Sequence, residues 1–143
     1  MLKGIPGIIG PELLKVLCEM GHTDELTIGD ANFPGHTYGK QVIRMDGHST
    51  LAILDAILEL FPLDSYVEHP VTLMAVVAGD DVKTPIWDDY KTIVSKHDSR
   101  GAACFEEIDK WEFYERTGKA SSVVIMTGEK ALYANIILKK GVV

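Results

Sequence analysis

The stretch from Met20 to Ala31 contains the residues whose types and spacing could do chemistry. His22 follows a glycine at the expected end of a helix, and Asp30 stands at the far end of a short apolar strand. An imidazole titrates near neutral pH, so His22 can both donate and accept a proton. Ligands of α/β proteins bind beside strand ends, which makes Asp30 a candidate ligand-binding carboxylate. A purely structural interpretation stays open, with Gly21 as a helix stop and His22 as a solvated cap.

Alternating apolar segments and turns around this stretch must position these two side chains. The alternation predicts an α/β sandwich, one domain over residues 1–143, with a mostly buried sheet of about six strands. The expected strands are Leu26–Gly29, Val42–Met45, Val71–Val77, Ala102–Ile108, Ser122–Met126 and Asn135–Leu138. The expected helices are Pro11–Met20, one from Ser49 or Thr50 to Phe61, one opening at Thr84-Pro85, and a short one at Phe113–Arg116 after a capping box that begins at Asp109. Residues 32–36 carry turn residues in series and are expected to form a loop.

The helix expected to end at Phe61 is apolar almost all round. Its apolar residues are Leu51, Ile53, Leu54, Ile57, Leu58, Leu60 and Phe61. A helix with this pattern is buried on more than one side. In a chain of 143 residues, the pattern favours a partner subunit that covers part of the helix.

The composition argues against several classes of function. The formal charge is 14 minus 21, or −7, and the longest basic run is Lys139-Lys140, so nucleic acid is not an expected partner. No apolar run approaches the roughly 20 residues that span a bilayer, and the first residues lack the apolar centre of a signal peptide. We therefore expect no membrane partner and a cytoplasmic location. Cys18 and Cys104 stand in apolar settings, which predicts buried free thiols in a reducing compartment.

Short motifs along the whole chain, in a fixed order, carry a resemblance. They are Pro11-Glu12-Leu13-Leu14-Lys15, Met20-Gly21-His22-Thr23-Asp24-Glu25, Asp30-Ala31-Asn32-Phe33-Pro34, Arg44-Met45-Asp46-Gly47, Leu63-Asp64-Ser65-Tyr66, Glu112-Phe113-Tyr114-Glu115-Arg116, Thr127-Gly128-Glu129, Tyr133-Ala134-Asn135-Ile136 and Leu138-Lys139-Lys140-Gly141-Val142. Each motif is weak alone, but the ordered set is specific. By this set the chain resembles the L-fucose mutarotase and D-ribose pyranase family, and more closely its fucose branch.

The resemblance implies an α/β fold that assembles into rings, usually decamers of two stacked pentamers, with the sugar site at a subunit boundary. It also implies roles for particular residues. His22 matches the proton donor of the family, and Asp30 matches a substrate-binding acid. Tyr133, Ala134 and Asn135 match the C-terminal segment that binds the sugar. Tyr133 and Asn135 could instead be structural turn residues.

One position departs from the pattern of the fucose branch. Where the family implies a sugar-contacting Arg just before the Phe-Tyr-Glu-Arg segment, this chain has Lys110, a point charge that cannot make the same bidentate contact. The chain also has one residue more than expected between Arg116 and Gly128, which suggests a bulge near Met126. That insertion leaves Trp111 as the alternative occupant of the position.

The resemblance implies an enzyme that interconverts the α and β anomers of L-fucose. Ring opening requires proton transfer to the ring oxygen and from the anomeric hydroxyl, and it requires no metal or cofactor. Pyranose–furanose exchange on D-ribose, and sugar binding for a transport system without turnover, are the alternatives. A metal hydrolase using His22, Asp30 and His36 is another, although the spacing matches no metal motif. His36 could also be a second sugar-site residue or a solvated loop histidine.

Overall fold

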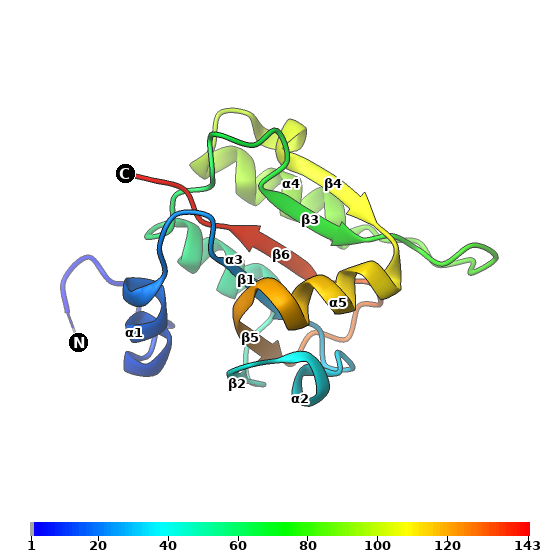
Figure 1. Ribbon diagram of the computed structural model, residues 1–143, viewed down its shortest axis with the longest axis horizontal. Helices are drawn as coiled ribbons and strands as arrows, with labels where there is room; N and C mark the ends of the chain where they lie inside the picture. The colour runs from blue at the N-terminus through cyan, green and yellow to red at the C-terminus, as the bar shows by residue number, and fades with distance from the viewer. Residues whose placement is uncertain (1) are drawn as a thin grey trace.

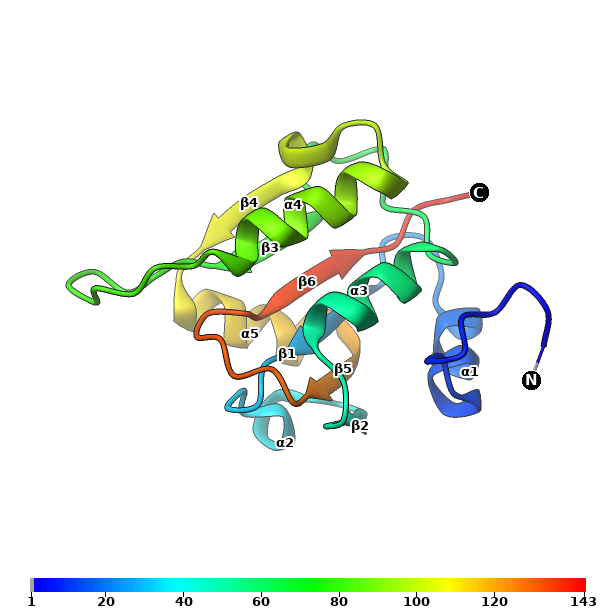
Figure 2. The ribbon, with the colours of Figure 1, turned by 180° about the vertical axis from the view of Figure 1, so that it is seen from behind.

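The computed structural model describes residues 2–143 and contains a six-stranded sheet with helices on both faces. The strands are β1 (Glu25–Gly29), β2 (Val42–Met45), β3 (Val71–Met74), β4 (Phe105–Ile108), β5 (Ser121–Thr127) and β6 (Ile136–Lys139). The helices are α1 (Pro11–Glu19), α2 (Gly35–Tyr38), α3 (Thr50–Leu58), α4 (Ile86–His97) and α5 (Lys110–Ala120), with a 3-10 turn η1 at Gly101–Cys104. α5 covers one face of the sheet (Figure 1), while α3 and α4 cover the other (Figure 2). This arrangement confirms the predicted α/β sandwich.

The strand directions decide where loops meet. The order in the sheet is β2-β5-β1-β6-β3-β4, and β6 is antiparallel to both of its neighbours while the other pairs are parallel. Five strands therefore end at one edge of the sheet, here called the carboxyl edge, and β6 begins there. The same five strands begin at the opposite edge, here called the amino edge. In sheets of this kind the carboxyl edge is where ligands bind.

Local signals in the sequence explain where several helices begin. Pro11 occupies the first turn of α1, where its missing N–H costs no hydrogen bond. The Ser49 hydroxyl accepts a hydrogen bond from the Ala52 N–H at the start of α3, and the Asp109 carboxylate accepts one from the Trp111 N–H at the start of α5. These contacts confirm Ser49 and Asp109 as cap residues, while the return bond from Glu112 that a complete capping box requires is not among the hydrogen bonds of the described residues.

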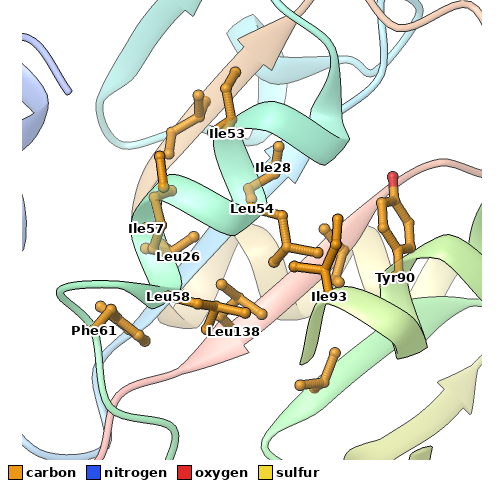
Figure 3. Close-up of a cluster of buried hydrophobic side chains, with 14 of the residues drawn as sticks. Leu26, Ile28, Ile53, Leu54, Ile57, Leu58, Phe61, Tyr90, Ile93 and Leu138 are labelled. Atoms are coloured by element: carbon orange, nitrogen blue, oxygen red, sulfur yellow. The ribbon is translucent and has the colours of Figure 1, made fainter. Parts of the chain in front are cut away.

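The main apolar core lies between the sheet and the helix pair α3 and α4 (Figure 3). Ile53, Leu54 and Ile57 of α3 are completely buried against Leu26 and other residues of the central strands. α4 lies beside α3 on the same face of the sheet, so the sheet and α4 together bury most of the apolar residues of this segment within one chain, while Leu51 and Leu60 are half-buried. That a partner subunit covers part of this helix stays a prediction.

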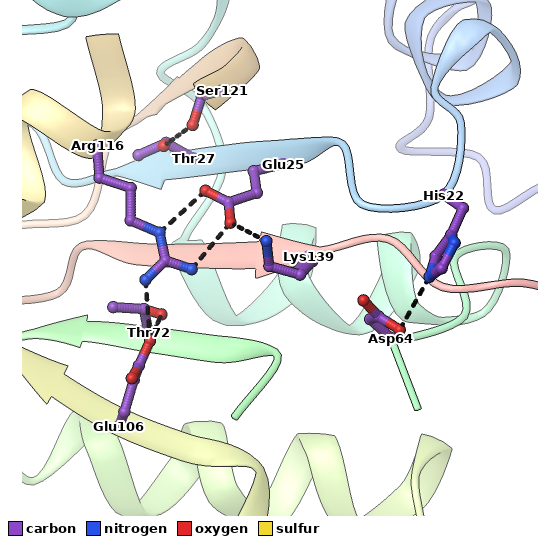
Figure 4. A network of polar contacts seen from close by, with 9 residues as sticks. All are labelled: His22, Glu25, Thr27, Asp64, Thr72, Glu106, Arg116, Ser121 and Lys139. Carbon is purple, nitrogen blue, oxygen red and sulfur yellow. Dashed lines mark hydrogen bonds and ion pairs between the residues drawn. The ribbon is translucent and has the colours of Figure 1, made fainter. Parts of the chain in front are cut away.

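A network of charged residues lies between α5 and the opposite face of the sheet (Figure 4). Arg116 of α5 donates to both carboxylate oxygens of Glu25, at 3.0 and 2.8 Å, and Lys139 Nζ lies 2.8 Å from Glu25 Oε1. Burial alone would raise the pKa of Glu25, but the two cations outweigh it and lower that pKa below its ordinary value. Arg116 also donates to Glu106, which accepts from the Thr72 hydroxyl. This network connects α5 with four strands, β1, β3, β4 and β6.

Several element boundaries differ from those expected. The helix expected to end at Phe61 ends at Leu58, and the helix expected from Phe113 begins at Lys110. The strand from Val71 ends at Met74, and the strand expected from Ala102 begins only at Phe105, after the 3-10 turn. The helix expected to end at Arg116 continues to Ala120, because Phe113 and Thr117 present a continuous buried face to the sheet. The expected loop at residues 32–36 runs into the short helix α2.

Two further expectations about particular residues were wrong. The pairing of β1 with β5 shifts between Glu25 and Leu26, which are opposite Ser121 and Val123, so the irregularity lies at Ser122 and not near Met126. Cys104 is buried as predicted, whereas Cys18 is exposed. Cys18 lies outside the buried face of α1, which is formed by Leu13, Val16 and Leu17.

No helix within residues 2–143 has the length and apolarity needed to cross a bilayer.

Candidate functional site

A cavity of about 190 Å³ lies at the carboxyl edge of the sheet. The strand directions bring its lining residues together from separate parts of the chain: the segment after β1, the loop after β3, the start of α5 and the segment before β6. The residues with polar groups that matter most are Asp30, Asp80, Lys110, Tyr114, Tyr133 and Asn135. The volume suits a small ligand, and the lining offers an acid, a cation, an amide and phenols within one space.

Asp30 is a buried carboxylate fixed by several donors. Its Oδ1 accepts from the Asn32 N–H at 2.9 Å, and its Oδ2 accepts from the Asn135 side-chain amide at 3.0 Å. Burial raises the pKa of Asp30 above its ordinary value, although these hydrogen bonds act in the opposite direction. The side chain is therefore a rigidly held acceptor at the end of β1, and its role as a ligand-binding acid stays a prediction.

The two residues that follow Tyr133 use their polar groups inside the protein. The Asn135 side chain donates to Asp30 and accepts from the Asp30 N–H at 2.8 Å, so both ends of the amide are occupied. The Ala134 carbonyl accepts from the buried Tyr90 hydroxyl at 2.7 Å. Asn135 lines the cavity and Ala134 does not, and their observed contacts hold Asp30 and the backbone in position.

Tyr133 has an unusual backbone conformation at the cavity. Its φ is +57°, a region that residues with side chains rarely adopt and that is enriched at functional sites. Its carbonyl accepts from the Trp87 indole N–H at 2.8 Å, which helps to hold this conformation. Its hydroxyl donates to Asp80 Oδ2 at 2.5 Å, and this hydrogen bond raises the pKa of the phenol.

Lys110 and Trp111, the two candidates for the basic position, lie side by side at the start of α5. Lys110 lines the cavity, and its ammonium lies 5.4 Å from the centre of the Trp111 ring and 5.8 Å from that of Tyr114. These are cation–π distances. The Trp111 side chain is 64% exposed and is not part of the cavity lining. The geometry thus favours Lys110 over Trp111 as the residue that faces a ligand.

His22 lies at the amino edge, in the turn before β1 (Figure 4). Its Nε2 is 3.2 Å from Oδ1 of Asp64, a residue with no exposed surface, and its ring centre is 5.3 Å from that of Tyr66. The next residue, Thr23, has a φ of +73°, so His22 also has a neighbour in a rarely adopted conformation. The imidazole is 40% exposed, which leaves one side of the ring accessible.

Within one chain, the structure does not bring His22 to Asp30. β1 lies between them in the sequence, and the five residues of this strand alone span about 13 Å at about 3.3 Å per residue. Asp64, and not Asp30, contacts the imidazole. His36 lies exposed on α2, outside the cavity lining. The three residues of the metal-hydrolase hypothesis therefore do not converge, and residues 2–143 contain no other cluster of potential metal ligands.

The sequence analysis assigned no role to Asp64 or Asp80, two acids that contact candidate site residues, although Asp64 belongs to the family motif Leu63-Asp64-Ser65-Tyr66. Asp64 follows the apolar run Phe61-Pro62-Leu63 and precedes no periodic segment, so nothing in its spacing indicates a partner. An acid directly after so apolar a run was the available signal, since buried carboxylates are paired. Asp80 stands in Gly79-Asp80-Asp81, which has the composition of an ordinary turn.

The fold and the cavity define an α/β protein with a preformed site for a small polar ligand at the carboxyl edge of its sheet. The chain belongs to the RbsD / FucU transport protein family, whose model matches residues 3–143. An L-fucose mutarotase from Glaesserella parasuis is 45% identical over 142 residues, which cover 99% of this chain and 96% of the relative.

Solved structures agree with this assignment. FucU from Bifidobacterium longum is 56% identical with a TM-score of 0.96, and 99% of each chain is covered. The fucose mutarotase of Streptococcus pneumoniae, solved with L-fucose, is 46% identical with a TM-score of 0.91 and the same coverage. Bacillus subtilis RbsD, solved with D-ribose, is more distant, at 26% identity and a TM-score of 0.73 over 100% of this chain and 99% of that one. The chain is thus more similar to the fucose branch, as the sequence motifs predicted.

Proposed function

We propose that the protein is an isomerase that interconverts the α and β anomers of L-fucose by opening and closing the sugar ring. The observation that carries the proposal is the cavity around Asp30 and Tyr133, in a chain that is 45% identical over nearly its full length to an L-fucose mutarotase. Ring opening requires acid–base groups and a site that orients hydroxyls. The cavity supplies the orienting groups, and His22 supplies an imidazole able to carry a proton.

Asp30 and Lys110 are the proposed sugar-binding residues. The fixed Asp30 carboxylate accepts hydrogen bonds from sugar hydroxyls, and the Lys110 ammonium donates to them. A Lys in place of Arg provides three rotatable donors and no planar fork, so this member holds its sugar with less fixed geometry at that position. Tyr133 contributes its phenol, while Ala134 and Asn135 support Asp30 from behind.

His22 reaches the sugar from a second copy of the chain in this proposal. The amino edge that carries His22 is opposite the carboxyl edge that carries the cavity. Contact between the amino edge of one copy and the carboxyl edge of the next would place both sets of groups around one sugar. Such a heterologous contact repeats, and it produces a ring when the rotation closes.

Exposed apolar side chains at both edges support this contact. Val77, Trp111 and Leu132 are exposed near the cavity, and Tyr66 is 75% exposed beside His22. Large apolar residues grouped in this way are typical of protein interfaces. We propose a homodecamer of two stacked five-membered rings in the cytoplasm, with each site at a subunit boundary and one domain per chain.

Two alternatives keep the same cavity. Pyranose–furanose exchange on D-ribose is disfavoured by the lower identity to the ribose-bound relative, 26% against 46% for the fucose-bound one. Sugar binding without turnover requires no proton-transferring group, so the accessible His22 imidazole, paired with the buried Asp64 carboxylate, favours the enzyme over the binding protein.

Magnetisation exchange between the anomeric protons of L-fucose, measured by NMR with D-ribose run in parallel, tests the proposal. We expect protein-dependent exchange for L-fucose that is lost in His22→Ala. Exchange at the buffer rate for L-fucose, with sugar binding retained, would support the binder. Faster exchange for D-ribose than for L-fucose would support the sister reaction.

A further inference from the structure

The Tyr133 hydroxyl lies between Asp80 and the cavity. It donates its single proton to Asp80 Oδ2 at 2.5 Å, and both side chains line the cavity. A phenol has one donor and two acceptor positions. With its proton directed at Asp80, the phenol oxygen is left to accept a hydrogen bond, and the Val77 N–H approaches it only at 3.4 Å. A sugar hydroxyl in the cavity can therefore donate to Tyr133.

Asp30 is poorly suited to take that proton itself. It is buried, and each of its oxygens already accepts a hydrogen bond, from Asn32 and from Asn135. These hydrogen bonds favour the ionised carboxylate, and its remaining acceptor positions hold sugar hydroxyls in the proposed function. Asp80, in contrast, is exposed at the rim of the cavity, where water can solvate it and exchange protons with it.

We propose that Tyr133 and Asp80 form a proton relay that removes the anomeric proton of the sugar during ring opening. This inference rests on the proposed function and identifies the base of that reaction. Asp80 touches no sugar atom in this scheme and acts through Tyr133. Tyr133 is the catalytic residue of the pair, because its oxygen meets the reacting hydroxyl.

The proton transfers of the step balance. The anomeric O–H bond breaks and its proton moves to Tyr133 Oη, while the phenol proton moves to Asp80 Oδ2. The electron pair left on the anomeric oxygen forms the carbonyl double bond as the bond between the anomeric carbon and the ring oxygen breaks. The ring oxygen takes a proton from the acid of the reaction. Ring closure on either face of the carbonyl reverses each transfer and restores both groups.

The backbone around both residues is arranged to hold the relay. Tyr133 has its positive φ, and the Trp87 indole holds its carbonyl. Asp80 follows Gly79, which has a φ of +88°. Only glycine adopts this conformation without strain, so the turn that aims Asp80 back at the cavity depends on it. The loop between β3 and α4 thus returns toward the segment before β6.

Asp80→Asn is the primary test, because the Asn oxygen can still accept the Tyr133 hydrogen bond but takes up no proton. We expect kcat for L-fucose exchange to fall by about 10- to 100-fold while KM changes little. Asp81→Asn removes the same charge from the neighbouring exposed residue and should leave both constants unchanged. Asp80→Glu keeps a carboxylate that can take up the proton and should therefore retain part of kcat, while Asp81→Asn controls for the loss of charge.

A double variant separates the relay from independent contributions. If Asp80 acts through Tyr133, adding Asp80→Asn to Tyr133→Phe should cause no further loss of kcat. Additive losses, or full activity in Asp80→Asn with an active wild type, would overturn the relay and leave the proposed function intact. A wild-type protein without exchange activity would overturn both.

Discussion

Asn135 and Asp30 hold each other through two hydrogen bonds across 105 residues of sequence. The amide of Asn135 donates to one carboxylate oxygen of Asp30, and its oxygen accepts from the Asp30 backbone N–H. One side chain thus fixes both the conformation of the backbone and the orientation of the acid. It also links the end of β1 to the start of β6, the one strand that runs against the others.

This pairing makes Asn135→Asp a sharp test of the sugar-binding role of Asp30. The change is isosteric but places a second carboxylate about 3 Å from the first, and two such groups resist ionising together. We expect sugar binding to weaken at neutral pH and to recover at lower pH, where the pair holds a proton that replaces the lost amide donor. The effect is measured as KM for L-fucose between about pH 4 and about pH 8. Asn32→Asp, which adds the same charge beside the cavity, is the control, and an identical pH profile in both variants would contradict the role of Asn135.

The buried ion pair between Arg116 and Glu25 yields a prediction about stability. Replacing Arg116 with Met leaves a buried carboxylate with Lys139 as its remaining cation, and breaking such pairs costs about 3–5 kcal/mol. Chemical unfolding would measure this loss. Lys119→Met, which breaks an exposed pair with Glu115 on the same helix, should cost less than about 1 kcal/mol. Equal losses of unfolding free energy in the two variants would show that the buried network contributes no more to stability than an exposed ion pair.

The same pair should give the stability a defined pH dependence. The pKa of Glu25 is lowered in the folded protein from an ordinary value of 4.5, so the unfolded chain takes up the proton first as pH falls. The stabilisation is fully present above the ordinary pKa and is lost as pH drops through the lower, folded value. We therefore expect the stability difference between wild type and Arg116→Met to shrink below about pH 4.5. A difference that grows on acidification would contradict this assignment.

The contact between His22 and Asp64 should matter for turnover. Asp64→Asn keeps the size of the side chain but removes the carboxylate that orients the imidazole, and we expect kcat to fall roughly 10- to 100-fold with KM little changed. Asp55→Asn provides a control. Asp55 Oδ1 lies 2.8 Å from His97 Nε2, and neither residue lines the cavity. Loss of activity in both variants, or in neither, would remove Asp64 from the reaction.

Sequence patterns predicted the order of the strands and helices because period and capping are local properties. Pro11, Ser49 and Asp109 each act within one turn of their own position. The carboxyl edge could be predicted as the location of a site for the same reason, since Asp30 directly follows an apolar strand. The extent of α5 was not predictable in this way, because burial of Thr117 depends on the strands beneath it.

Contacts between distant segments set the limit of the sequence predictions. His22 and Asp30 are eight positions apart, and only the strand between them shows that they belong to opposite edges. Asp64 lies 42 residues from its partner His22, and Asp80 lies 53 residues from its partner Tyr133. No local pattern reports such pairings, so the resemblance to known relatives named candidate residues but not the residues that contact them.

The claim that a sugar site needs two copies of the chain can be tested most directly by mixing two inactive variants. His22→Ala retains an intact cavity, and Asp30→Asn retains an intact imidazole. When the two are unfolded together and reassembled, random mixing should place a complete site at about one quarter of the boundaries between copies. We predict that L-fucose exchange, absent from each variant alone, returns to about that fraction of the wild-type rate. Mixed assemblies that remain as inactive as the separate variants would contradict a site shared between subunits.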